Sequence, residues 1–150
     1  MLDVEELSAI VVDTAFHLHR GLGPGLLESV YEVVLAHQLQ QRGLHVERQK
    51  TVPIVYAGLY FDEGFRADLL VENVLLLELK SVQTLAPVHT KQVLTYLRLL
   101  DLRLGLLINF GAALFKDGVE RIVNHHAPTS SSRLRINQAR SAQESEDGRE

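Results

Sequence analysis

The sequence contains no cysteine among its 150 residues. This absence excludes disulfide bonds and thiolate metal sites, and it favours the reducing cytoplasm as the location. No continuous apolar stretch is long enough to cross a bilayer, so no membrane partner is expected. The N-terminal segment MLDVEELSAIVV has no basic residues ahead of its apolar residues, which argues against a secretory signal.

Basic residues are too few for a protein that coats nucleic acid through bulk charge. The formal net charge is -4, and residues 1–126 carry 11 lysines and arginines against 15 aspartates and glutamates. A polyanion must therefore be bound by a local patch. The acidic excess also suits a site that gathers carboxylates around a cation. The candidate phosphate contacts are Arg48, Lys50, Arg66, Lys91, Arg98 and Arg121.

The length and the 46% hydrophobic content predict one globular domain over residues 1–126. Residues 127–150 have few large apolar residues and no periodicity, and we expect a disordered tail there. Apolar residues at helical spacing predict helices at about 3–21, 26–42 and 87–100, and Gly21, Gly23 and Pro24 should stop the first. Asp3 should cap the first of these helices, and Glu28 lies in the first turn of the second.

Alternating residues predict strands at 46–58, 59–71, 74–82, 102–111 and 119–123, with turns at Asp62-Glu63-Gly64 and Lys116-Asp117-Gly118. The first three strands should form an antiparallel meander. The helix between the third and fourth strands permits a crossover to a parallel neighbour. The fold class is therefore α/β (α+β), with a mixed central sheet flanked by helices and the fourth strand near its centre.

The stretch ADLLVENVLLLELKSV at residues 67–82 contains charged residues inside an apolar strand. Glu78 and Lys80 share one face of that strand, because residues two apart face the same way. A two-residue turn at residues 72–73 would set Asp68 opposite Leu77, on the wrong face. One extra residue in the turn would set Asp68 opposite Glu78 instead, and the hypothesis of a joint site requires that residue.

Two carboxylates so placed repel each other unless a proton or a cation lies between them. Their hard oxygen ligands suit Mg²⁺ or Mn²⁺. Lys80 beside them could orient or deprotonate water, or neutralise charge on phosphorus. The simpler alternative is a solvated Glu-Lys pair on an exposed strand face, and for an arbitrary E-x-K motif it is favoured about ten to one.

The pattern Asp68…Glu78-x-Lys80, followed by a helix, resembles the PD-(D/E)XK nuclease superfamily. The spacing of Gly25, Glu28 and Tyr31 resembles the motif that names its bacterial GxxExxY branch, and HRGLGPGLLESVYE, FRADLLVE, LLLELKSV and GLLINFG also match. The resemblance covers about residues 10–123. It implies a restriction-endonuclease-like α-β-β-β-α-β core with an extra N-terminal helix.

The resemblance also implies roles for individual residues. Glu28, Asp68 and Glu78 resemble the metal-binding acids, and Lys80 resembles the catalytic lysine. Gln92 and Tyr96 resemble a Q-x-x-x-Y element in which the glutamine lies near the site. The proline that usually precedes the first aspartate is absent, since this chain has Arg66-Ala67-Asp68.

Other candidate substrate contacts are His19, His89 and Arg66. For His19, interaction with the dipole at its helix end is favoured about two to one over a phosphate contact. Tyr31 is expected to pack under Glu28 with its hydroxyl hydrogen-bonded. Asn109 is expected to bridge backbone at a strand end.

The resulting expectation is a Mg²⁺- or Mn²⁺-dependent nuclease or phosphodiesterase acting on DNA or RNA. The first alternative is a catalytically silent module with the same fold, which binds nucleic acid or a nucleotide or acts as an assembly subunit. The second is a structural domain whose Glu78 and Lys80 point into open solvent, far from Glu28. Because so small a core cannot wrap a duplex alone, a homodimer is also considered.

Overall fold

The computed structural model describes residues 2–125, and the tail expected at residues 127–150 lies outside them. The elements, in chain order, are α1 (Val4–Leu22), α2 (Glu28–Gln41), β1 (Val46–Tyr56), β2 (Leu59–Val71), β3 (Leu75–Lys80), α3 (Pro87–Leu100), β4 (Leu104–Asn109), α4 (Phe115–Gly118) and β5 (Val119–Val123). This order reproduces the predicted α-α-β-β-β-α-β-β sequence with one short helix added before β5.

The helix boundaries follow local sequence signals. Asp3 caps α1 through a reciprocal capping box with Glu6, as predicted. The helix ends at Gly23, one of the predicted stop residues, whose φ of 74° favours glycine. Helix α2 begins at Glu28, which places this carboxylate at the positive end of the helix dipole. The expected turn at residues 116–118 is instead part of α4.

The five strands form one mixed sheet in the order β1-β2-β3-β4-β5. Strands β1, β2 and β3 are antiparallel, β3 and β4 are parallel, and β5 closes the other edge antiparallel to β4. Every residue of β4 is buried, which confirms its predicted central position. The predicted meander and parallel crossover are both confirmed.

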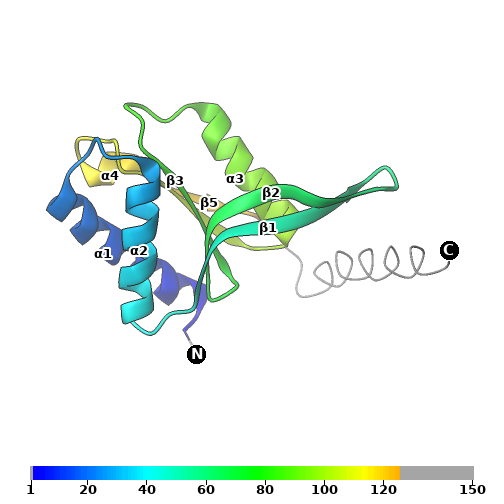
Figure 1. Ribbon diagram of the computed structural model, residues 1–150, viewed down its shortest axis with the longest axis horizontal. Coiled ribbons are helices and arrows are strands. Elements are labelled where there is room, and N and C mark those ends of the chain that lie inside the picture. The colour runs from blue at the N-terminus through cyan, green and yellow to red at the C-terminus, as the bar shows by residue number, and fades with distance from the viewer. Residues whose placement is uncertain (1, 126–150) are drawn as a thin grey trace.

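Helices cover both faces of the sheet, with α1 and α2 on one side and α3 on the other (Figure 1). Alternate residues of β3 serve the two sides: Leu75, Leu77 and Leu79 pack against α1 and α2, whereas Leu76 packs against α3. Glu78 shares the face of Leu76 because the strand period is two. The side of the sheet that carries α3 therefore also carries the charged residues of β3.

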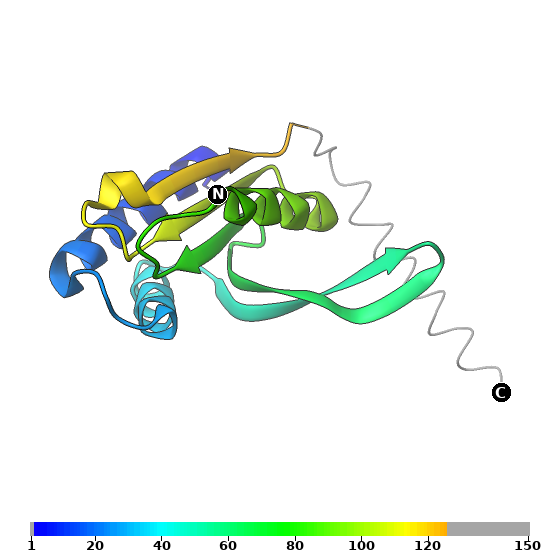
Figure 2. The same cartoon turned by 90° about the horizontal axis from the view of Figure 1, so that it is seen from above.

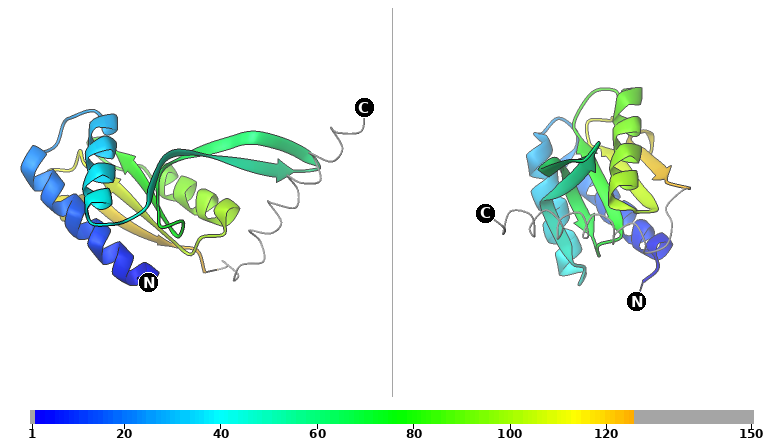
Figure 3. Two further views of the ribbon diagram at one scale, coloured as in Figure 1. Left: turned by 60° about the horizontal axis from the view of Figure 1, so that its bottom comes forward. Right: turned by 90° about the vertical axis from the view of Figure 1, so that its right-hand side faces the viewer.

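The hairpin of β1 and β2 extends well beyond the rest of the sheet (Figures 2 and 3). The predicted turn at Asp62-Glu63-Gly64 is wrong, because β2 runs through these residues without a break. The register shifts there instead, since Val52 pairs with Phe65 and Ile54 pairs with Phe61. Three residues of β2 thus face Pro53 alone, and the proline, which has no N–H for a ladder bond, accommodates this bulge.

No helix within residues 2–125 is long and apolar enough to cross a membrane.

Candidate active site

The sheet forks where β2 separates from β3. Their pairing covers only Leu69 with Leu77 and the two pairs beyond it toward the turn. Asp68 and Glu78 are the next residues on the two strands, so they face each other at the fork. Their side chains replace the ladder there: the Asp68 N–H donates to Glu78 Oε1 at 3.2 Å, and the Leu79 N–H donates to Asp68 Oδ2 at 2.9 Å.

The turn between β2 and β3 contains the extra residue that this arrangement requires. Glu72 and Asn73 adopt left-handed backbone conformations, with φ of 52° and 57°. The Val74 N–H then donates to the carbonyl of Val71 at 3.1 Å, and Val74 precedes the first residue of β3. The three-residue connection sets Asp68 opposite Glu78 and confirms the predicted register.

Glu78 is a buried carboxyl group with only 4% of its surface exposed. Burial raises the pKa of Glu78 to about 9, and the negative charge of Asp68 adds to the effect. The N–H bond from Asp68 and the charge of Lys80 oppose this shift without cancelling it. At neutral pH, without a cation beside it, Glu78 therefore keeps its proton. The solvated Glu-Lys pair and the open-solvent alternative are both wrong for this strand.

Lys80 is half-buried at the end of β3, where the neighbouring parallel strand fixes the backbone. The Phe110 N–H donates to the Lys80 carbonyl at 2.8 Å. Asn109 holds the next loop, because its amide accepts from the Val82 N–H at 3.0 Å and donates to the Val82 carbonyl at 2.9 Å. The same Asn109 oxygen accepts from Gly111, which confirms the predicted bridge at the strand end.

Glu28 reaches the same region from the start of α2. Burial raises the pKa of Glu28 above its usual value, the charge of Asp68 adds to this shift, and Lys80 partly offsets it. Helix α2 thus contributes a third carboxylate within electrostatic range of the fork. Glu28 itself is exposed and has no hydrogen bond in the described part of the chain.

Tyr31 of α2 holds the loop that leads into this helix through two hydrogen bonds of its hydroxyl group. The Tyr31 hydroxyl donates to the Gly23 carbonyl at 2.7 Å and accepts from the Leu26 N–H at 3.0 Å. Its fully buried ring stacks on Phe110 with centroids 4.5 Å apart, as expected for a packed and hydrogen-bonded tyrosine. Gly25 has a φ of 101°, which explains the glycine before the helix.

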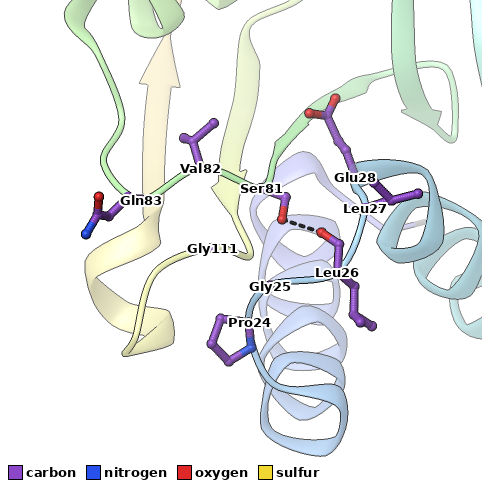
Figure 4. A pocket seen from close by; sticks show the side chains of 9 residues that line it. All are labelled: Pro24, Gly25, Leu26, Leu27, Glu28, Ser81, Val82, Gln83 and Gly111. Carbon is purple, nitrogen blue, oxygen red and sulfur yellow. Dashed lines mark hydrogen bonds between the residues drawn. The ribbon is translucent and has the colours of Figure 1, made fainter.

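A cavity of about 500 Å³ lies between this loop and the segment after β3 (Figure 4). Glu28 lies at one side of the cavity and Gln83 at the other, and Gly111 contributes backbone. The Ser81 hydroxyl donates to the Leu26 carbonyl at 2.6 Å and joins the two walls. The hollow therefore adjoins Glu28, whereas Asp68 and Glu78 do not line it.

Sequence reasoning missed two residues that connect α2 to the fork. Glu32, one helical turn after Glu28, is buried and ion-paired with Arg48 at 3.0 Å. The Gln49 amide donates to Glu32 at 2.5 Å and to Asp68 Oδ1 at 3.3 Å. Gln49 has a φ of 50°, which interrupts the pairing of β1 with β2 at this point. The available signal was the i, i+4 spacing of the two glutamates on one helix face.

Gln92 and Tyr96 flank the acid pair from α3. The Gln92 amide donates to the Tyr96 hydroxyl at 2.8 Å, and the Tyr96 ring stacks on Phe65 at 4.0 Å. Burial raises the pKa of Tyr96, and the charges of Glu78 and Asp68 raise it further. Tyr96 therefore lies within electrostatic range of the acid pair, and Gln92 is joined to it by the hydrogen bond.

The other three predicted substrate contacts, His19, His89 and Arg66, each have a hydrogen-bond or ion-pair partner within the chain. His19 lies in the last turn of α1, as expected for a helix-end histidine, but its ring is buried and its Nε2 is hydrogen-bonded to the Ala112 carbonyl at 2.7 Å, which argues against a phosphate contact. His89 accepts from the Ala86 N–H at 3.1 Å and caps α3. Arg66 is exposed and pairs with Glu63 at 2.5 Å. Of the three, only Arg66 remains accessible near Asp68.

The donor set fits a hard divalent ion. Carboxylate oxygens are the ligands that Mg²⁺ and Mn²⁺ prefer, and a pair forced together in a buried position is stabilised by a cation between them. Within residues 2–125, no three acidic or histidine side chains already stand close enough to enclose an ion. The Asp68–Glu78 pair is in place, and the exposed Glu28 would have to turn toward it.

In a comparison with protein families, the model of the PD-(D/E)XK nuclease superfamily matches residues 5–122 of the chain. The matched range includes all of the residues that surround the fork. No curated protein and no solved structure gives a significant match.

Proposed function

The chain belongs to the PD-(D/E)XK nuclease superfamily, and from this premise we propose that it hydrolyses phosphodiester bonds in nucleic acid with a divalent ion. The observation that carries the proposal is the facing pair of Asp68 and Glu78 at the fork of the sheet. Lys80 follows on the same strand, and Glu28 is charge-coupled to Asp68 and to Lys80 from another element. A structural domain would have no need for this concentration of buried and half-buried charge.

In the proposed reaction, Asp68 and Glu78 would hold Mg²⁺ or Mn²⁺ through their oxygens, and Glu28 would complete the protein ligands. When bound, such an ion supplies Lewis acidity, which polarises a phosphoryl oxygen and lowers the pKa of water. The ammonium group of Lys80 stabilises the negative charge that develops on the phosphoryl group. The two backbone N–H bonds at the fork fix the carboxylates before substrate arrives.

The proposed substrate contacts surround this centre. Gln92 and Tyr96 border it from α3, and Arg66 can exchange its pairing with the exposed Glu63 for a phosphate. The cavity beside Glu28 offers room for a nucleotide that flanks the cleaved bond. We leave His19 and His89 out of the contact set because their hydrogen bonds hold the fold.

The finer classification also belongs to the proposal. The motif of Gly25, Glu28 and Tyr31 supports assignment to the GxxExxY branch, and the tyrosine has a structural reason in its two hydrogen bonds. The cysteine-free composition supports a location in the cytoplasm, and the resemblance to the GxxExxY branch supports a bacterial source. The proposal includes both DNA and RNA as substrates, and the cleavage assay decides between them.

The test is a cleavage assay with Mg²⁺ or Mn²⁺ on single-stranded, double-stranded and branched DNA and on RNA. We expect cleavage of at least one substrate by the native chain, and its loss in Glu78→Ala and Lys80→Met. Glu72→Gln removes an exposed carboxylate from the nearby turn and should stay active. Activity that persists in Glu78→Ala would reveal a contaminant and contradict the proposal. Metal binding without cleavage of any substrate would favour the catalytically silent module.

A further inference from the structure

The projecting hairpin of β1 and β2, from Lys50 to Ala67, has no neighbour within the described part of the chain over most of its length. We call it the arm. Strand β3 pairs with β2 only over Leu69–Val71, so both edges of the arm present unpaired backbone groups. Figures 2 and 3 show the arm extending away from the sheet and its helices. A two-stranded ribbon is marginally stable by itself in water, so a partner would stabilise the arm.

One face of the arm is apolar from base to tip. Cross-strand pairs share a face, and three successive pairs on this face are apolar. We call this set the apolar stripe, and its members are Val52 with Phe65, Ile54 with Phe61, and Tyr56 with Leu59. At the base, the stripe meets α3 through the stacking of Phe65 on Tyr96. Toward the tip it is uncovered, since Tyr56 is 78% exposed, Leu59 62% and Phe61 46%.

The charge of the arm argues against nucleic acid as the occupant. Residues 52–65 contain two carboxylates and no lysine or arginine. Glu63 pairs with Arg66, which is opposite Thr51 and therefore lies on the face away from the stripe. Phosphate contacts require a cluster of cations, and the outer part of the arm offers none. The occupant must therefore present an apolar surface of similar length.

We propose that this occupant is the arm of a second copy of the chain, packed stripe against stripe across a two-fold axis. In an antiparallel arrangement, Tyr56 and Leu59 of one copy would pack on Phe61 of the other, because Val52 at the base of the stripe is already buried. The stripe is uncharged along its whole length, so this self-pairing brings no like charges together. Such an isologous contact closes after two copies and leaves no free stripe.

The exposed area is sufficient for a reversible dimer. Taking about 150–250 Å² for a large side chain, the three exposed stripe residues present roughly 350 Å² per copy. Two copies would bury roughly 700 Å² from these side chains alone, and backbone and flanking residues would bring the total to about 1,000 Å², the lower range of specific interfaces. A contact of this size predicts a dimer that dissociates on dilution.

The test is the mass of the full chain by sedimentation equilibrium across a wide range of concentrations. We expect a dimer that dissociates on dilution. The double variant Tyr56→Ser/Leu59→Ser should raise its dissociation constant at least about tenfold. The matched control is Leu114→Ser, which removes an exposed leucine outside the arm and should leave the dimer intact. The tip residues lie outside both cores, so circular dichroism should show that the double variant still folds.

A thiol probe gives an independent readout, because the chain has no cysteine of its own. Phe61→Cys places a single thiol at the middle of the stripe, near the proposed axis, and should cross-link two chains under mild oxidation. Leu114→Cys should not. A native chain that stays monomeric at every concentration would overturn the proposal, as would a dimer that Tyr56→Ser/Leu59→Ser leaves unchanged. A monomeric native chain would mean that the occupant of the stripe is another protein or residues 126–150. The outcome does not depend on whether the chain cleaves nucleic acid.

Discussion

Replacing Glu78 with glutamine should change how the stability of the metal-free protein depends on pH. The folded pKa of Glu78 is about 9, against 4.5 for an unperturbed glutamate. At a pH between these two pKa values, Glu78 is ionised in the unfolded chain but keeps its proton in the folded chain. The stabilising contribution of Glu78 is therefore complete below the unfolded pKa and is lost as pH rises toward about 9.

The magnitude follows from proton linkage. One group whose protonation differs between the two states changes the free energy of unfolding by up to about 1.4 kcal/mol per pH unit. From about pH 6 to about pH 8, the native chain should lose up to about 3 kcal/mol relative to Glu78→Gln. For a domain of this size, that difference corresponds to roughly 10 °C in melting temperature. The raised pKa of Glu28 is common to both proteins, so its effect cancels in the comparison.

The assay is thermal unfolding of both proteins in chelator-treated buffers across this pH range, with Glu72→Gln as the control for loss of one carboxylate. The native chain and Glu72→Gln should lose stability with rising pH more steeply than Glu78→Gln. Mn²⁺ should reverse the trend for the native chain, because the ion favours ionised Glu78, and should affect Glu78→Gln much less. Parallel curves for the native chain and Glu78→Gln without metal would refute the reasoning.

Three further predictions concern residues around the fork. Lys80→Met should lower cleavage at least about a hundredfold without weakening Mn²⁺ binding in calorimetry, because the substitution removes a positive charge near the ion. Tyr31→Phe should keep the stacking on Phe110 but lose two buried hydrogen bonds, which should lower the free energy of urea unfolding by about 1–3 kcal/mol. Asn109→Ala should cost about 2–4 kcal/mol in the same measurement, because two hydrogen bonds to Val82 in the loop after β3 and one from Gly111 are lost. An unfolding free energy within about 0.5 kcal/mol of the native value would contradict either stability prediction.

The central strands could be predicted because local rules decide them. The period of two in β3 places Glu78 and Lys80 on one face whatever surrounds the strand. The count of residues between Asp68 and Glu78 restricts their register to two choices, and the three-residue connection selects one of them. Tyr31 was predicted correctly for a similar reason, since a tyrosine on a buried helix face requires a partner for its hydroxyl.

The features that sequence reasoning missed depend on distant partners. Gln49 bridges α2 and β2 through a backbone conformation that its own sequence does not indicate. The residues Asp62-Glu63-Gly64 have the composition of a turn, yet Pro53 on the opposite strand makes them a bulge. The place of His19 near a helix end was predicted, but its ring contact with the Ala112 carbonyl, 93 residues away in sequence, was not. Each of these missed features depends on a long-range contact.

The most direct test of the central claim is the anomalous difference map of a crystal soaked in Mn²⁺. The proposal predicts a peak at the fork, about 2.0–2.4 Å from oxygens of both Asp68 and Glu78, with the Glu28 carboxylate turned toward it. No peak at the fork, or a peak elsewhere with these carboxylates still hydrogen-bonded only to backbone and Gln49, would contradict the account.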